Sequence, residues 1–108
     1  MIYELRTYEL FNHTRKPFHD RFREHVLRLF KQYNIELVGA WETEIGELQN
    51  FVYILKWKDF ADRQEKWDTF NNDKEWAKIK AQTQKDFGQI VWKNHSSLLK
   101  PVDYSPLQ

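Results

Sequence analysis

The most regular pattern of the chain runs over residues 50–58, where large apolar side chains alternate with smaller apolar ones. The large side chains occupy every second position: Phe51, Tyr53, Leu55 and Trp57. The positions between them carry Val52 and Ile54. A strand with one face in water alternates apolar with polar residues, so two apolar faces indicate a strand covered on both sides. We therefore predict a central strand here.

The same kind of pattern predicts the other elements. Alternation indicates further strands at residues 2–10, 35–43 and 90–99. Apolar residues spaced three and four apart predict a helix that begins at Pro17 and ends near Asn34: Phe18, Phe22, Val26, Leu29, Phe30 and Tyr33. Asp59 and Asp73 are predicted to cap two more helices, and Gly88 to end the second of them.

This order of elements predicts a fold. It is βαββαβ with an extra helix before the last strand, the α+β ferredoxin-like plan, in one domain over residues 1–108. The helices of that plan cover one face of the sheet. We expect the other face to carry the aromatic set Phe51, Tyr53, Leu55, Trp57 and Trp41. Because so large an apolar patch is not left in water, we predict a homodimer in which two sheets pack as an α/β barrel.

Composition narrows the classes of protein. The net charge is +1, so no overall field favours nucleic acid or an acidic membrane surface. Cysteine is absent, which excludes disulfides and thiolate chemistry. No apolar run reaches membrane-spanning length and no signal peptide is evident, so we expect a cytoplasmic protein without membrane insertion.

Four segments resemble the NIPSNAP family of the dimeric α/β-barrel superfamily. They are YELRTY at residues 3–8, GAWETEIG at 39–46, Arg63 followed by DKEW at 73–76, and PVDYSPL at 101–107. The chain differs from the family pattern at residues 11–13, where a Pro-Gly pair is usual, and at Asn34, where glycine is usual. Both differences lie in predicted loops.

The resemblance implies a function only in outline. The family has no settled reaction, and its longer animal members are associated with mitochondria and with scaffolding or vesicle roles. Sister families of the same architecture include cofactor-independent monooxygenases and haem-degrading enzymes. Fold alone does not fix function, so whether this chain is an enzyme stays open.

Arg6 and Tyr8 are the first candidate site residues. They alternate with Leu5 and Thr7, and we expect them to face away from the helices, toward the barrel interior. A guanidinium there must be paired or must bind an anion. In one interpretation Arg6 holds a ligand carboxylate or phenolate to which Tyr8 hydrogen-bonds. In the other, Arg6 pairs with Glu4 or with an acidic residue of a partner sheet.

His95 lies within the last predicted strand, beside the first. If it points inward it meets Arg6 or Tyr8 and acts as a general base with Tyr8 as its catalytic partner. The alternative is a solvent-exposed edge histidine or a dimer contact. Aromatic residues of the two central hairpin strands are candidates for stacking on a planar ligand, or else for core packing: Trp41, Tyr53 and Trp57.

Motifs for hydrolases, metalloproteases and nucleotide-binding proteins are absent, and we predict neither a metal nor a cofactor. One hypothesis is a dimeric protein that binds a small aromatic or hydrophobic anion, or oxidises it without metal. The alternative is a protein-interaction or scaffolding module without catalysis. A haem-handling protein is disfavoured because the helix after residues 50–58 has no histidine for an axial ligand.

Overall fold

Four antiparallel strands form one sheet in the computed structural model, which describes residues 1–47 and 50–108. Their order in the sheet is β2-β3-β1-β4. The strands are β1 (Ile2–Leu10), β2 (Glu36–Glu42), β3 (Asn50–Trp57) and β4 (Val91–Leu99). The first and third strands are therefore central, as predicted, and the α+β ferredoxin-like fold class is confirmed.

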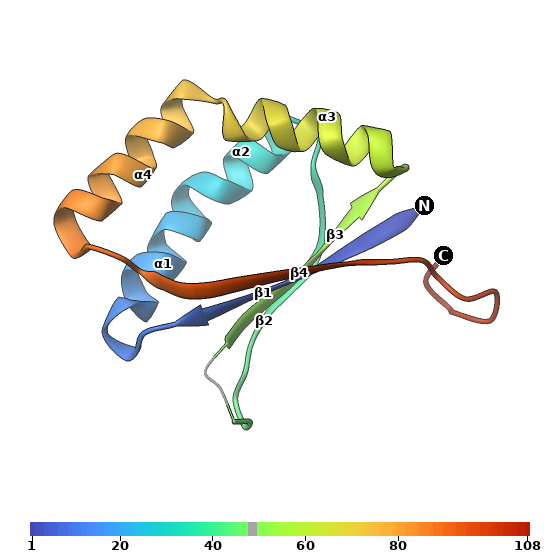
Figure 1. Ribbon diagram of the computed structural model, residues 1–108, viewed down its shortest axis with the longest axis horizontal. Coiled ribbons are helices and arrows are strands. Elements are labelled where there is room, and N and C mark those ends of the chain that lie inside the picture. Colours follow the sequence, from blue (N-terminus) through green and yellow to red (C-terminus); the bar gives the residue numbers. More distant parts are fainter. Residues whose placement is uncertain (48–49) are drawn as a thin grey trace.

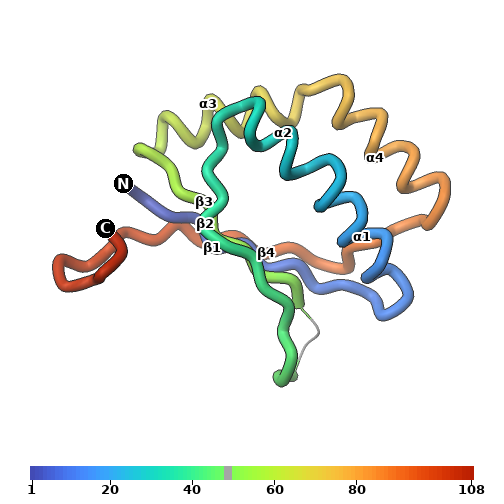
Figure 2. Tube along the Cα trace, turned by 180° about the vertical axis from the view of Figure 1, so that it is seen from behind, coloured from blue at the N-terminus to red at the C-terminus, as the bar shows by residue number. Residues whose placement is uncertain are grey.

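All the helices lie over one face of this sheet (Figures 1 and 2). A short 3₁₀ turn, η1 (Asn12–Thr14), leads into a continuous helical run: α1 (Arg15–Arg21), the π-helical η2 (Phe22–Val26) and α2 (Leu27–Gln32). The extra helix gives the pair α3 (Phe60–Asn71) and α4 (Lys74–Phe87). The carboxylates of Asp59 and Asp73 accept backbone N–H bonds at the starts of these two helices, which confirms both predicted caps. In the part of the chain that is described, no helix has the length and apolar character needed to cross a membrane.

The core lies between the helices and the aromatic side of β3. Phe51, Tyr53, Leu55 and Trp57 are at most 4% exposed and pack against the apolar stripe of the α1–α2 run. The prediction that this set forms the uncovered face is wrong. Both faces of β3 are apolar, and the larger side chains fill the deeper space under the helices, where more area leaves water.

Trp41 does not share that face, because the pairing of β2 with β3 shifts register between Leu37 and Gly39. Leu37 pairs with Leu55, whereas Gly39 pairs with Ile54 and Trp41 with Val52, so Gly39 and Trp41 point to the uncovered side. Trp41 is 52% exposed there, and its ring lies over Gly39 so closely that an added Cβ would be 2.7 Å from it. Only glycine leaves room for this arrangement.

The uncovered face of the sheet is apolar as well. It carries Leu5 and Thr7 of β1 opposite Ile54 and Val52 of β3, with Trp41 at one side. Residues 100–108 turn back beside the N-terminal end of β1 (Figure 1), where the Tyr3 hydroxyl donates to the Gln108 carbonyl over 2.7 Å. The tail thus covers only one end of the face.

Candidate functional site

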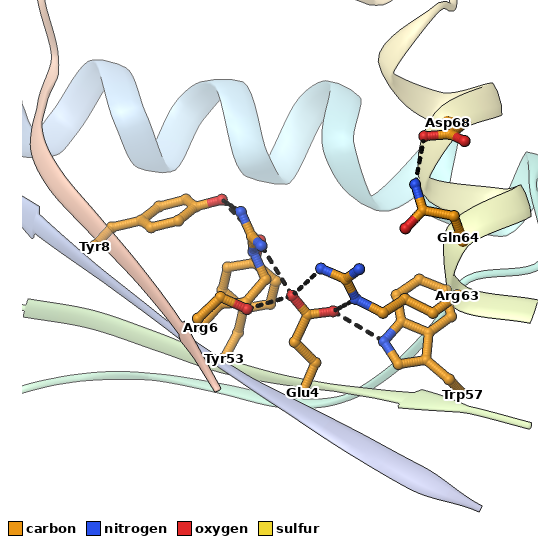
Figure 3. A network of polar contacts seen from close by, with 9 residues as sticks. Glu4, Arg6, Tyr8, Tyr53, Trp57, Arg63, Gln64 and Asp68 are labelled. Carbon is orange, nitrogen blue, oxygen red and sulfur yellow. Dashed lines mark hydrogen bonds and ion pairs between the residues drawn. The ribbon is translucent and has the colours of Figure 1, made fainter. Parts of the chain in front are cut away.

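Three polar residues of β1, Glu4, Arg6 and Tyr8, lie under the helices, beside the aromatic side of β3 (Figure 3). Glu4 is 0% exposed, and its carboxylate accepts bonds from Trp57 Nε1 at 3.0 Å and from Arg63 Nε of α3 at 2.8 Å. Arg6 Nη1 donates to the same carboxylate over 3.0 Å, and the Ser96 hydroxyl of β4 adds another bond. The prediction that Arg6 faces away from the helices is therefore wrong. Ion pairs with the Glu4 carboxylate let both arginine side chains lie under the helices.

The Glu4 carboxylate is held ionised by its donors. Burial alone would raise the pKa of Glu4, but hydrogen bonds from Arg63, Ser96 and Arg6 outweigh burial and lower it to about 2. Of the two interpretations of Arg6, the structure shows the ion pair with Glu4. Arg63, one of the residues that carry the family resemblance, is largely buried in this network.

Two tyrosine hydroxyls share the remaining donors of Arg6. Its Nε donates to Tyr53 Oη over 2.7 Å and its Nη2 donates to Tyr8 Oη over 3.0 Å, while the two hydroxyl oxygens are 2.8 Å apart. Burial and the neighbouring Tyr8 raise the pKa of Tyr53, so its hydroxyl keeps its proton. The two hydroxyl protons of the pair then each need a hydrogen-bond acceptor. One proton bridges the two oxygens, and the other has no acceptor among the described residues.

The unmatched proton belongs on Tyr8. Tyr53 is 1% exposed, and an unsatisfied donor in the core costs about 1–3 kcal/mol. Tyr53 therefore donates to Tyr8, and Tyr8 keeps a free O–H. The Tyr8 side chain borders a cavity of about 50 Å³ between the sheet and the helices. The residue that carries the free donor is thus one of those that border this cavity.

The rest of the cavity wall is apolar except for one cation. The apolar side chains are Phe18, Phe22, Val26, Phe30, Phe70 and Trp76. The cation is Arg21 of α1, whose guanidinium lies 5.0 Å from the centre of the Trp76 ring. Burial lowers the pKa of Arg21, and no carboxylate in residues 1–47 or 50–108 pairs with it. The sequence contains one indication that Arg21 is buried, because this residue falls three positions after Phe18, on the apolar stripe of the helix.

The structure brings together only part of the predicted site. Arg6, Tyr8 and Tyr53 meet directly, and Trp57 joins them through Glu4. His95 pairs across the sheet with Thr7 and binds Glu9 on the uncovered face, with 2.7 Å between Nε2 and Oε2. Of the two alternatives for His95, the structure shows the exposed edge histidine and not one that meets Arg6 or Tyr8, because alternate residues of β1 point to opposite faces.

Neither Trp41 nor a metal cluster adds to this site. Trp41 lies on the uncovered face, apart from the cavity. Among the residues that the structure describes, no three His, Asp or Glu side chains are grouped so that they could hold a metal ion. The chemistry of the cavity therefore comes from the Tyr8 hydroxyl, the Arg21 guanidinium and an apolar wall.

Comparison with other proteins gives the family. The chain matches the NIPSNAP family over residues 3–106, and no match was found among curated proteins. It is similar to a NIPSNAP family protein of unknown function, Atu4242 from Agrobacterium tumefaciens, with 27% identity, 100% and 94% of the two chains covered, and a TM-score of 0.85. An uncharacterized NIPSNAP domain protein from Burkholderia xenovorans has 22% identity, 98% and 99% coverage, and a TM-score of 0.83.

A more distant likeness is to a monooxygenase from the gene ActVA-Orf6 of Streptomyces coelicolor, solved in complex with the ligand Nanaomycin D. Its identity is 8%, the coverage is 96% of this chain and 89% of that one, and the TM-score is 0.62. So low an identity shows a shared fold alone. The family match, by contrast, spans almost the whole sequence, and the chain belongs to the NIPSNAP family.

Proposed function

We propose that this protein binds a small molecule that places an apolar group in the cavity and an oxygen against Tyr8. The observation that carries the proposal is that Tyr8, whose hydroxyl is held by Arg6 and Tyr53, borders an apolar cavity. A pocket of few polar groups in an apolar wall is typical of small-molecule sites. Arg6 positions the Tyr8 hydroxyl, and Glu4 in turn positions Arg6.

The proposal includes a homodimer formed by the uncovered faces of two sheets. It rests on Leu5, Val52 and Ile54 instead of the β3 residues that the sequence named, and Trp41, which the sequence also named, lies beside them. An apolar sheet face with helices on its other side only is suited to pack against a second sheet. Light scattering at micromolar concentration should give the mass of two chains, and Ile54→Lys should give that of one. A wild-type monomer would end this part of the proposal.

Native mass spectrometry of gently purified protein tests binding. We expect wild type to retain a discrete added mass that Tyr8→Phe loses, because the variant keeps the ring and removes the free donor. Tyr104→Phe is the matched control, since Tyr104 is 84% exposed and far from the cavity lining. Equal retention in both variants would refute the role of Tyr8.

Oxidation of the bound molecule stays a prediction. The monooxygenase from Streptomyces coelicolor shares the fold and was solved with a bound ligand, and that likeness is what favours oxidation. Oxygen consumption on addition of the molecule identified by mass spectrometry would test it, with Tyr8→Phe as the comparison.

A protein-interaction module is the second candidate function. It is favoured by the apolar side chains that the end of β4 and the tail expose: Leu98, Leu99, Val102, Tyr104 and Leu107. A partner that is captured by wild type and Tyr8→Phe alike, but not by Tyr104→Ser, would support this alternative over the cavity.

A further inference from the structure

A groove on the outer surface adjoins the cavity. It lies between the α1–η2 segment and α4, and has a volume of about 430 Å³. Among the described residues, Arg21 alone lines both the groove and the inner cavity. Its guanidinium therefore stands between the apolar interior and a solvent-accessible groove.

The charged side chains that line the groove differ in whether they have an ion-pair or hydrogen-bond partner. Asp20 pairs with Lys16 and Arg23, and Asp86 accepts a bond from the Gln82 amide. Glu24 has His25 3.9 Å away. The two cations of the groove other than histidine, Arg21 and Lys78, have no carboxylate within ion-pairing distance in the described part of the chain. Among the described residues the groove therefore has one acid, Asp20, paired with Lys or Arg, and two cations without a carboxylate partner.

We infer that the ligand of the proposed site is a short-chain carboxylate, whose apolar chain occupies the inner cavity and whose charged group binds Arg21 at the mouth. This inference rests on the proposed function and adds the chemical class of the ligand. A carboxylate fits the planar guanidinium, to which it forms two parallel bonds. The Tyr8 hydroxyl supplies a third donor from the cavity wall.

The cavity also limits the size of the apolar chain. One water molecule needs about 10–15 Å³ of such space. A cavity of about 50 Å³ thus has the capacity of roughly three to five waters, which corresponds to about as many methylene groups. Pentanoate, with its four carbons beyond the carboxylate, is a suitable probe, and 1-pentanol is its uncharged counterpart.

Binding of the two probes is measured by NMR titration of wild type, Arg21→Gln and Arg23→Gln. Arg23 is the matched control, because it loses the same charge close by in the helix and lines neither the cavity nor the groove. We expect Arg21→Gln to weaken pentanoate binding by about 10- to 100-fold, the range for a lost charge-assisted bond. Binding of 1-pentanol should change by less than about 3-fold, and Arg21→Lys should recover part of the loss.

The outcomes separate this inference from the proposed function. If pentanoate and 1-pentanol both bind wild type and Arg21→Gln leaves pentanoate unaffected, the carboxylate class is wrong and the cavity site stands. If Arg21→Gln and Arg23→Gln weaken pentanoate equally, the effect is one of net charge and the inference also fails. If neither probe shifts resonances of the cavity residues, the inference fails, and native mass spectrometry then decides the proposed function on its own. Thermal unfolding of each variant shows that the fold is retained.

Discussion

Replacing Glu4 with glutamine tests the buried ion network most directly. The change keeps the size of the side chain and removes the charge that pairs with Arg6 and Arg63. Both arginine side chains are less than a fifth exposed, so each loses its ionic partner in a place with little water. We expect a large loss of stability near neutral pH and a small one in acid.

The magnitude follows from the pKa of Glu4. Its value falls from 4.5 to about 2 on folding, and each pKa unit corresponds to about 1.36 kcal/mol. When the pKa of an acid is lower in the folded state than in the unfolded state, its charge stabilises the fold at every pH above the unfolded-state pKa. The contribution is lost as the pH falls toward 2. The free energy of unfolding of wild type should therefore exceed that of Glu4→Gln by about 3 kcal/mol above pH 5. At pH 3 the difference should be only about 1 kcal/mol.

Urea unfolding at pH 7, 5, 4 and 3, at one protein concentration, measures this difference. Glu65→Gln is the control, since its carboxylate has no ion pair among the described residues. Other carboxylates also titrate in this range, but they cancel in the comparison of the two proteins. A difference that stays constant from pH 7 to pH 3, or that is below about 1 kcal/mol at pH 7, would contradict the argument.

Two further predictions concern stability. Asp59→Ala should cost about 1 kcal/mol in urea unfolding, because the carboxylate no longer accepts the Asp62 N–H at 2.8 Å at the start of α3; no loss would contradict the capping role. Thr14→Val should cost about 1–3 kcal/mol, because Thr14 Oγ1 donates to the buried Ile90 carbonyl over 2.8 Å. Thr14→Ser, which keeps that bond, should unfold closer to wild type, and equal losses would assign the effect to packing instead.

The amino-acid pattern predicted the elements better than their orientation. Strand alternation and helix spacing are local properties, so the central position of β3 and the caps at Asp59 and Asp73 followed from the sequence. Which side of β3 meets the helices is decided by global packing, and both of its sides are apolar. The register shift in β2 likewise left no local signal beyond Gly39, so Trp41 was expected on the correct, uncovered face but was wrongly grouped there with the aromatic side of β3.

The site was predicted in part for a related reason. Arg6, Tyr8 and Tyr53 were named and do meet, although under the helices. Their polar character suggested solvent or a barrel interior, and only the buried arrangement of Glu4 with two arginines makes the helix side favourable. His95 was grouped with them because β4 lies beside β1, yet adjacency in a sheet does not fix the face.

The π-helical turn at Phe22–Val26 has a consequence for how the sequence of this segment can vary. A π turn accommodates one residue more than the α-helical path around it. Removing a residue from an α-helix rotates everything beyond the deletion by about 100°, but removing one here would restore regular α geometry. NIPSNAP relatives that are one residue shorter in this helical run would thus keep the same apolar stripe. A one-residue alignment gap there would mark a change from π-helix to α-helix and not the loss of a loop.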